Sequence, residues 1–181
     1  HLVALPETRD YKRAFEDDKG PNTGGMGSYK DTGNKLPFMT GEDKIKEFEL
    51  VNRVFEDLKG KGSNPELRGI PFYAAFIHTS MGPKILEVNS RPGDPEIMNI
   101  LPILNDDFVE VCYNMIDGTL RKVKFKKKAT VVTYKVPPGY GGYATKFPDQ
   151  INLDEVDAPV DLSGAEKLAQ NNPNNYRVYP G

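Results

Sequence analysis

The chain has 181 residues, a formal net charge of −2 from 26 acidic and 24 basic side chains, and a single cysteine. This length suits one ordinary domain, or one domain and part of a second. The near-neutral charge argues against a nucleic-acid-binding protein, which usually carries a marked basic excess. The lone Cys112 excludes an internal disulfide framework and fits a reducing compartment. No apolar run approaches the roughly 20 residues of a membrane span. We therefore expect a cytoplasmic location and neither a nucleic-acid nor a membrane partner.

The first third of the chain predicts one strand, one loop and one helix. Residues 2–6 are an apolar run closed by a proline and predict the middle of a strand, so we expect a piece of a longer protein. Residues 7–34 are polar and Gly-rich, with too few apolar positions for a regular element. Residues 40–60 predict an amphipathic helix that Thr40 can cap, with Asp43 three residues later. Its apolar stripe consists of Ile45, Phe48, Val51, Val54, Phe55 and Leu58.

A β-hairpin is predicted next, from strands at residues 70–79 and 83–89 joined by a short turn that ends at Gly82. His78 lies in the first of these strands. No second metal-type residue stands near it in the sequence, so we interpret it as a surface or packing residue.

Two helices should follow the hairpin. Asp94 can cap the first, with Pro95 as its first helical residue, and Pro102 must break or kink it. The second covers residues 105–117 and ends at Gly118. It contains Cys112 at an apolar position, which predicts a buried structural thiol.

The last third changes in composition. Residues 122–128 alternate lysines with apolar residues, which we interpret as a solvated edge or linker in preference to a patch for an anionic ligand. A strand at 129–136 and a loop at 137–142 follow. The remainder is rich in Pro, Asp and Asn, with short apolar pieces at 151–156 and 176–179. We therefore expect one domain in residues 1–121 and part of a β-rich C-terminal domain in residues 122–181.

A glycine-rich run at residues 17–27 is the first candidate for binding. Glycines allow backbone conformations closed to other residues and let main-chain N–H groups approach a ligand closely. Just upstream, Asp10, Lys12 and Arg13 add charges that could hold a phosphate or a carboxylate. On its own, such a run fits a flexible surface loop equally well.

A second candidate is the end of the strand at residues 83–89. Glu87 and Asn89 are two residues apart, so their side chains should share one face with Ile85. A carboxylate and an amide oxygen side by side suit Mg²⁺, which binds through one or two such groups together with substrate phosphates.

Just beyond the strand, Arg91 could grip an anion through two hydrogen bonds. The structural alternative is a strand that ends in a polar turn, where Asp94 only caps the next helix.

Together the two runs resemble a known family. Residues 10–29, DYKRAFEDDKGPNTGGMGSY, are similar to the DHKR…GPNTGGMGAY signature of the phosphoribosylamine–glycine ligases. Residues 85–96, ILEVNSRPGDPE, resemble the EFN.RFGDPE run of the same family. Residues 101–111, LPILNDDFVEV, resemble the helix that follows it. The resemblance covers nearly the whole chain and weakens after Gly142.

The resemblance implies an α+β fold of the ATP-grasp type, which clamps ATP between two lobes. This chain would supply the C-terminal metal-binding lobe, an antiparallel sheet with helices. The implied activity is part of purine biosynthesis. Glycine is activated by ATP as glycyl phosphate and joined to 5-phosphoribosylamine, which gives glycinamide ribonucleotide, ADP and phosphate. The family match makes Glu87 and Asn89 ligands of Mg²⁺ or Mn²⁺.

The other assigned residues would surround glycine and the ribose phosphate. Arg91 and Asp94 are assigned to catalysis. The residues assigned to substrate or phosphate binding are Asp10, Lys12, Arg13, Asn22, Thr23, Gly24, Gly25, Met26 and Gly27.

Three departures from the family pattern stand out. Pro92 replaces a usual Phe, and residues 72–76 carry no acid where many ATP-grasp enzymes place a further carboxylate. Family members are also considerably longer, so the expected partner is the N-terminal part of the same enzyme, and the isolated piece should be inactive. Two alternatives stay open. One is an ATP-grasp ligase with another amine acceptor. The other is a non-catalytic module, against which the presence of both Glu87 and Asn89 counts.

Overall fold

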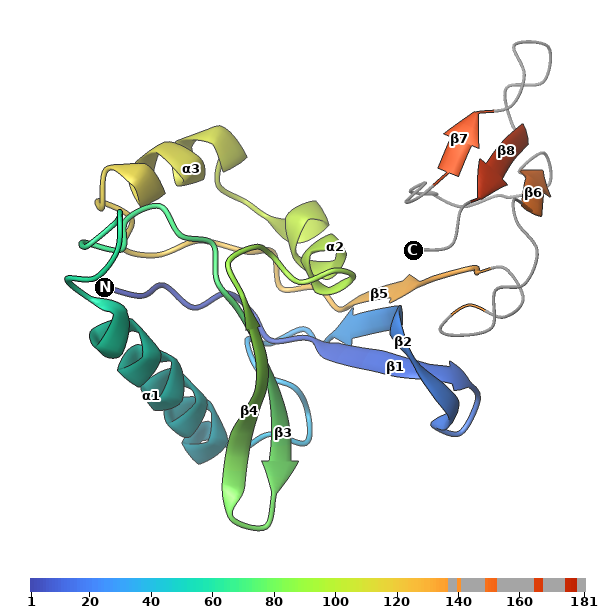
Figure 1. The fold of residues 1–181 in the computed structure, drawn as a ribbon, viewed down its shortest axis with the longest axis horizontal. Coiled ribbons are helices and arrows are strands. Elements are labelled where there is room, and N and C mark those ends of the chain that lie inside the picture. Colours follow the sequence, from blue (N-terminus) through green and yellow to red (C-terminus); the bar gives the residue numbers. More distant parts are fainter. Residues whose placement is uncertain (137–139, 141–148, 153–164, 168–174, 179–181) are drawn as a thin grey trace. The chain divides into compact units, whose positions relative to one another are not determined.

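The computed structural model describes residues 1–136, 140, 149–152, 165–167 and 175–178 (Figure 1). They fall into two compact units. The first comprises His1–Asp10 and Gly27–Val132, and the second comprises Tyr11–Met26 and Thr133–Gly181. Helices and antiparallel strands are mixed along the chain, so the predicted α+β class is confirmed. The predicted domain boundary after residue 121 remains a prediction.

The polar segment expected to be a loop contains two strands instead. Strand β1 spans Arg9–Phe15 and β2 spans Lys19–Lys30, and with β5 (Thr130–Thr133) they form a sheet of order β1-β2-β5. Exposure alternates along β1 with the period of two that a strand requires. The pattern escaped prediction because the less exposed positions include Asp10 and Lys12, so the alternation is one of burial and not of hydrophobicity.

The strand predicted at residues 2–6 is absent, since no described strand pairs with that segment. Helix α1, in contrast, forms as predicted over Gly41–Leu58. Thr40 is its N-cap: its hydroxyl accepts from the Asp43 amide at 3.1 Å, and the Asp43 carboxylate accepts from the Thr40 amide at 2.9 Å. Beyond the helix, Gly60 takes a φ of 77°, a conformation that glycine adopts without strain.

The predicted hairpin is also confirmed. Strands β3 (Tyr73–Thr79) and β4 (Gly82–Asn89) pair antiparallel. Helix α1 runs beside the hairpin and packs on β4 (Figure 1).

The helix after the hairpin is short and starts differently from the prediction. Helix α2 covers Glu96–Ile100 with Pro95 as N-cap and without a side-chain cap, so the predicted capping role of Asp94 is wrong. The physical reason is that backbone carbonyls already serve the first turn. The amide of Ile97 donates to the Gly93 carbonyl at 2.9 Å, and the amide of Met98 donates to the Pro95 carbonyl at 3.0 Å.

The break predicted at Pro102 is confirmed, because α2 ends and a 3₁₀ turn, η1 (Leu101–Ile103), takes over. Helix α3 then covers Phe108–Ile116, with the Asp107 carboxylate accepting from the Glu110 amide at 3.0 Å. Its start lies later than predicted, since the amide of Asn105 donates instead to the carbonyl of Lys124 at 2.9 Å.

Side-chain exposure in this part tests two further expectations. The lysines of residues 122–128 are exposed, as expected of a solvated edge. Cys112 is half-buried and not fully buried, because α3 is largely uncovered: Phe108, Val109, Tyr113 and Ile116 are all exposed.

The core of the first unit is small and partly polar. Its buried apolar side chains are Leu36, Met39, Ile100 and Ile103. Buried Lys30 donates from Nζ to the carbonyls of Asp31 (2.5 Å), Gly33 (3.0 Å) and Lys128 (3.2 Å), and burial lowers its pKa. Buried Asn99 of α2 donates to Ser28 of β2 and accepts at its carbonyl from Thr130 of β5 at 3.0 Å. These bonds tie α2 to the sheet.

The second unit contains strands β6 (Asp149–Asn152), β7 (Ala165–Lys167) and β8 (Asn175–Val178), in an antiparallel sheet of order β6-β8-β7. Strands β6 and β8 overlap the apolar pieces predicted at 151–156 and 176–179. The predicted loop at 137–142 lies outside the described residues except for Tyr140. In the described part of the chain, no helix is long and apolar enough to cross a membrane.

Candidate active site

The end of β4 carries the two predicted metal ligands. Glu87 is paired with Ala75 of β3, and Asn89 is paired with Tyr73. Residues opposite each other in an antiparallel pair, and residues two apart on one strand, project from the same face. Glu87 and Asn89 therefore share a face, as predicted. Glu87 is exposed and Asn89 is half-buried, so both border solvent.

A β-bulge changes which residues accompany them. The register shifts between Ala75 and Phe76, so Glu87 pairs with the first and Ile85 with the second, and Leu86 is the extra residue. Because successive residues of β3 point to opposite faces, Ile85 does not share the face of Glu87. The prediction that placed Ile85 with the ligands is wrong, since it assumed an unbroken strand.

The turn after β4 contains Arg91 and Asp94, and both are exposed. One guanidinium nitrogen of Arg91 donates to the carbonyl of Pro92 at 2.8 Å. Gly93, in contrast, is buried. A Cβ at Gly93 would lie 2.5 Å from Oε2 of Glu96 and 2.7 Å from the ring of Tyr73, so a larger residue would force one of these side chains to move.

Tyr73 and Glu96 were not predicted as part of the site. The hydroxyl of Tyr73 donates to Oε1 of Glu96 at 2.7 Å. Burial is the main cause that raises the pKa of Tyr73 well above its usual range; the bond to Glu96 and the charges of Glu96, Asp10 and Glu87 add to it. Tyr73 is therefore a protonated donor, and the predicted residues Asp10 and Glu87 lie near it. In the sequence, the short run from Gly93 to Glu96 was the signal that could have pointed to Glu96.

The first motif presents mostly backbone. The hydroxyl of Thr23 donates to the Lys12 carbonyl at 2.9 Å and accepts from the Gly25 amide at 3.1 Å. Arg13 donates to the Gly20 carbonyl at 2.8 Å. Thr23 and Arg13 thus hold β1 and β2 together locally. Gly25 is buried, as is Gly27 beyond it, whereas Asn22 and Gly24 are exposed.

The predicted residues fall into both compact units. The first unit contains Asp10, Gly27, Glu87, Asn89, Arg91 and Asp94. The second contains Lys12, Arg13, Asn22, Thr23, Gly24, Gly25 and Met26. Within the first unit, Asp10 and Glu87 both act on Tyr73. The assignment of both sets to substrate binding remains a prediction.

Comparison with known proteins decides the family. Residues 1–97 match the family described as phosphoribosylglycinamide synthetase, ATP-grasp (A) domain. The chain belongs to this family. The matched segment contains both motifs on which the resemblance was based, so the predicted family is confirmed.

Curated relatives of this chain carry the name phosphoribosylamine–glycine ligase. The protein of Methanocorpusculum labreanum is 46% identical over 142 residues, which are 77% of this chain and 32% of that protein. The protein of Methanosarcina barkeri is 47% identical over 141 residues, with the same coverage. The chain thus spans about a third of the length of these relatives. A crystal structure of phosphoribosylamine–glycine ligase from Thermotoga maritima matches with a TM-score of 0.67 and 26% identity, over 98% of this chain and 42% of that one.

The ATP-grasp family uses ATP and a divalent metal in general, and the donors at the end of β4 fit such an ion. Glu87 offers a carboxylate and Asn89 an amide oxygen, both hard ligands, and their side chains share one face of β4. Among the described residues, no group of three His, Cys, Asp or Glu side chains could hold a metal. Glu87 and Asn89 as the protein ligands of a metal ion therefore stay a prediction.

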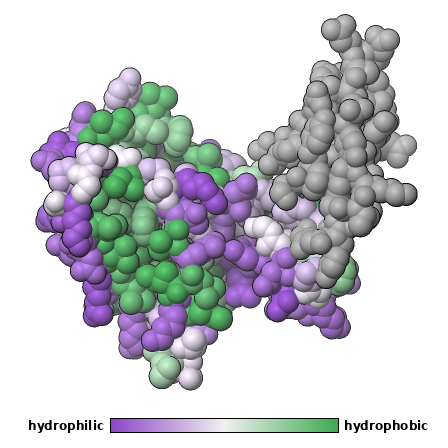
Figure 2. Space-filling view, viewed as in Figure 1, coloured by the Kyte–Doolittle hydropathy of each residue, from purple (hydrophilic) through white to green (hydrophobic). Residues whose placement is uncertain are grey.

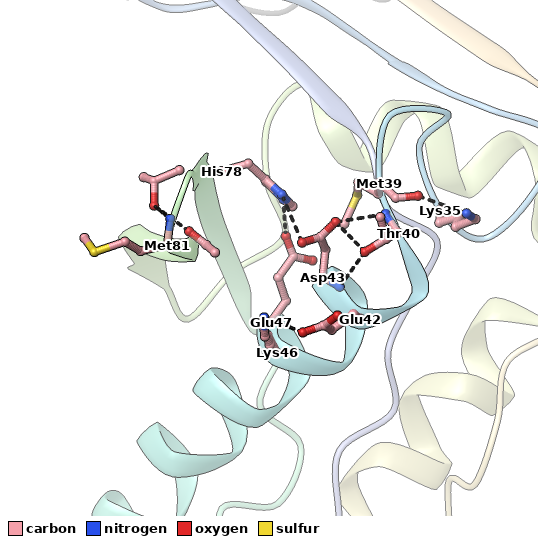
Figure 3. Close-up of polar contacts among 11 residues, drawn as sticks. Lys35, Met39, Thr40, Glu42, Asp43, Lys46, Glu47, His78 and Met81 are labelled. Atoms are coloured by element: carbon pink, nitrogen blue, oxygen red, sulfur yellow. Dashed lines mark hydrogen bonds and ion pairs between the residues drawn. The ribbon is translucent and has the colours of Figure 1, made fainter.

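A separate polar cluster joins α1 to the β3–β4 hairpin (Figure 3). His78 lies 2.8 Å from Oε1 of Glu47 through Nε2, and 3.9 Å from Asp43 through Nδ1. Burial raises the pKa of Glu47, and the bond to His78 partly opposes this. The His78 ring also meets Phe38 edge-on, with centroids 6.3 Å apart. His78 is an exposed residue whose ring contacts Phe38, which agrees with the prediction of a surface or packing residue, although two carboxylates that the sequence did not indicate lie close to it.

Proposed function

We propose that the complete protein is an ATP-dependent ligase that joins glycine to 5-phosphoribosylamine. The products are glycinamide ribonucleotide, ADP and phosphate, and glycyl phosphate is the intermediate. The observation that carries the proposal is the pair Glu87 and Asn89 on one face of β4, within the segment that matches the family.

We assign the metal ion as Mg²⁺, or Mn²⁺ in its place, with Glu87 and Asn89 as its protein ligands. When bound, such an ion offsets negative charge on the phosphates during phosphoryl transfer. The carboxylate of Glu87 supplies charge, and the neutral Asn89 supplies an oxygen without adding repulsion toward ATP.

The remaining assigned residues would bind glycine and the ribose phosphate. The glycine-rich run of Asn22, Thr23, Gly24, Gly25, Met26 and Gly27 would let the main chain approach anionic oxygens closely. Lys12, Arg13 and Asp10 would add charged groups for these substrates. Arg91 keeps guanidinium N–H groups beyond its bond to Pro92 and can hold a phosphate or carboxylate oxygen. Asp94 can orient the attacking amine and take up its proton.

The proposal also sets location and partners. We expect small-molecule substrates and place the protein in the cytoplasm. The rest of the same polypeptide would supply the opposing lobe that encloses ATP.

Two alternatives can be separated from this proposal by one set of assays on the full-length protein. ADP release should require both glycine and 5-phosphoribosylamine, and mass spectrometry should detect glycinamide ribonucleotide. ADP release with another amine in place of phosphoribosylamine would instead identify a different ATP-grasp ligase. A protein that binds ATP but releases no ADP with any carboxylate and amine would be a non-catalytic module.

A further inference from the structure

Glu96 is a carboxylate in an unfavourable place. It is 7% exposed, and although Oε1 accepts from Tyr73, Oε2 is buried without a hydrogen-bond partner in the part of the chain that the structure describes. A buried polar atom that lacks a partner costs free energy, and a charged one costs more. Stability alone therefore does not explain the Tyr73–Glu96 pair.

The pair joins the two ends of the turn that follows the proposed metal ligands. Tyr73 is the register partner of Asn89, the last residue of β4. Glu96 is the first residue of α2. Their hydrogen bond, 23 residues apart in sequence, closes the six-residue turn between β4 and α2.

Gly93 shows how closely that turn is held. The ideal Cβ position at Gly93 is within 2.7 Å of both the Tyr73 ring and the Glu96 carboxylate, so the backbone lies directly against the pair. The Gly93 carbonyl also accepts from the Ile97 amide of α2 at 2.9 Å. The middle of the turn is thus fixed from both sides.

We infer that Tyr73 and Glu96 are positioning residues for the metal face, because their hydrogen bond, packed on Gly93, fixes the turn that follows Asn89 and carries Arg91. The inference rests on the proposed function. The Tyr73 side chain emerges on the same face as Glu87 and Asn89, so a shift of its ring displaces the turn beside the ligands. Mg²⁺ demands nearly ideal octahedral geometry, and displacements of about 0.5 Å in a supporting residue are felt.

The test uses the full-length protein and the Tyr73→Phe variant, which removes only the hydroxyl. Binding of Mn²⁺ in the presence of ADP is followed by electron paramagnetic resonance of free Mn²⁺. We expect the Mn²⁺ dissociation constant to rise about 3- to 10-fold, the loss that one hydrogen bond accounts for. The melting temperature should fall by a few degrees at most. Tyr113→Phe, at a 65% exposed position on α3, is the matched control and should change neither.

A conservative variant separates positioning from charge. Glu96→Gln keeps an oxygen that can accept from Tyr73, so Mn²⁺ affinity should stay within about twofold of wild type. Glu96→Leu removes the acceptor and should match Tyr73→Phe. Unchanged Mn²⁺ affinity in Tyr73→Phe would overturn the inference, as would equal losses in Tyr73→Phe and Glu96→Gln. A wild-type protein that binds Mn²⁺ with ADP but makes no glycinamide ribonucleotide would count against the proposed function, and the variants would still decide the positioning role.

Discussion

The two motifs of the candidate site are built in opposite ways. In β2, the glycine-rich strand, the backbone is the feature presented, and the Thr23 hydroxyl serves only to tie Lys12 and Gly25 together. At the end of β4, side chains are presented, and the exposed Glu87 stands beside the half-buried Asn89. The first motif should thus be sensitive to added atoms and the second to removed or exchanged ones.

The largest expected effect tests whether the two motifs suffice. Residues 1–181 contain both but span about a third of the curated relatives, so we expect them to bind ATP–Mg²⁺ weakly and to form no glycinamide ribonucleotide. A grasp-type site needs groups on both sides of the nucleotide. Apolar residues are exposed over α3 and between α1 and β4, including Leu86 at 64% and Val88 at 46%, so self-association is also expected (Figure 2). Calorimetric titration and an ADP-release assay measure binding and turnover; ligase turnover by this piece would contradict the prediction.

Glu87→Gln should have the next largest effect. The variant keeps the shape but loses the ligand charge, and loss of several kcal/mol of charge stabilisation lowers kcat about 100-fold or more. Because Glu87 is exposed, the melting temperature should stay unchanged. Steady-state kinetics at saturating Mg²⁺ in the full-length protein is the measurement. Glu110→Gln, at an exposed position on α3, is the control; equal turnover in both variants would remove Glu87 from the metal site.

Gly93→Ala tests the difference between the two motifs, because it adds an atom just after β4, where the motif presents side chains. The new Cβ would meet Glu96 and Tyr73 at 2.5 and 2.7 Å. Overpacking of this kind costs about 1–3 kcal/mol of unfolding free energy, measured by urea denaturation. Gly41→Ala in α1 is matched to it, since a Cβ there meets nothing within 4 Å and alanine favours the helix. If both variants lost the same stability, the tight packing of Gly93 would be disproved.

Thr23→Val sharpens the account of the backbone motif. It keeps the shape of the side chain but loses the hydroxyl that bonds Lys12 and Gly25. We expect the free energy of unfolding to fall by about 1–2 kcal/mol. The KM for phosphoribosylamine should rise, because the glycine run loses the hydrogen bonds that hold its backbone. The exposed Thr32→Val is the control. A stable variant with a normal KM would show that β2 holds its backbone without Thr23.

The smallest effect should come from Glu47→Gln, outside both motifs. Burial raises the pKa of Glu47, so the folded protein binds this proton more tightly than the unfolded chain does. Ionised Glu47 therefore costs stability above the raised pKa. The variant should be slightly more stable than wild type at pH 7, and the difference should shrink as the pH falls toward that of an unfolded glutamate. The side chains of His78, Asp43 and Glu7 near Glu47 stay unchanged in the variant, and its denaturation is compared with that of Glu49→Gln, at an exposed position on the same helix. Turnover should not change; a gain that grows at low pH would have the wrong sign.

Elements with local signals were predictable. Helix α1 formed over the expected residues because Thr40 and Asp43 cap it within one turn. The hairpin followed from two apolar runs around Gly82. The shared face of Glu87 and Asn89 also followed from their spacing, since no bulge intervenes between them. Each of these depends on contacts a few residues apart, which the sequence displays directly.

Contacts between distant residues were decided by the tertiary structure alone. Residues 9–30 became strands because pairing satisfies their backbone groups despite a polar pattern. The bulge at Leu86 and the bond from Tyr73 to Glu96 both depend on how β3 and β4 meet. The sequence by itself therefore determined the family, the helix, the hairpin and the candidate ligand pair. Only the fold decided which side chains hold that pair in place, because their partners lie many residues away and are brought close by packing.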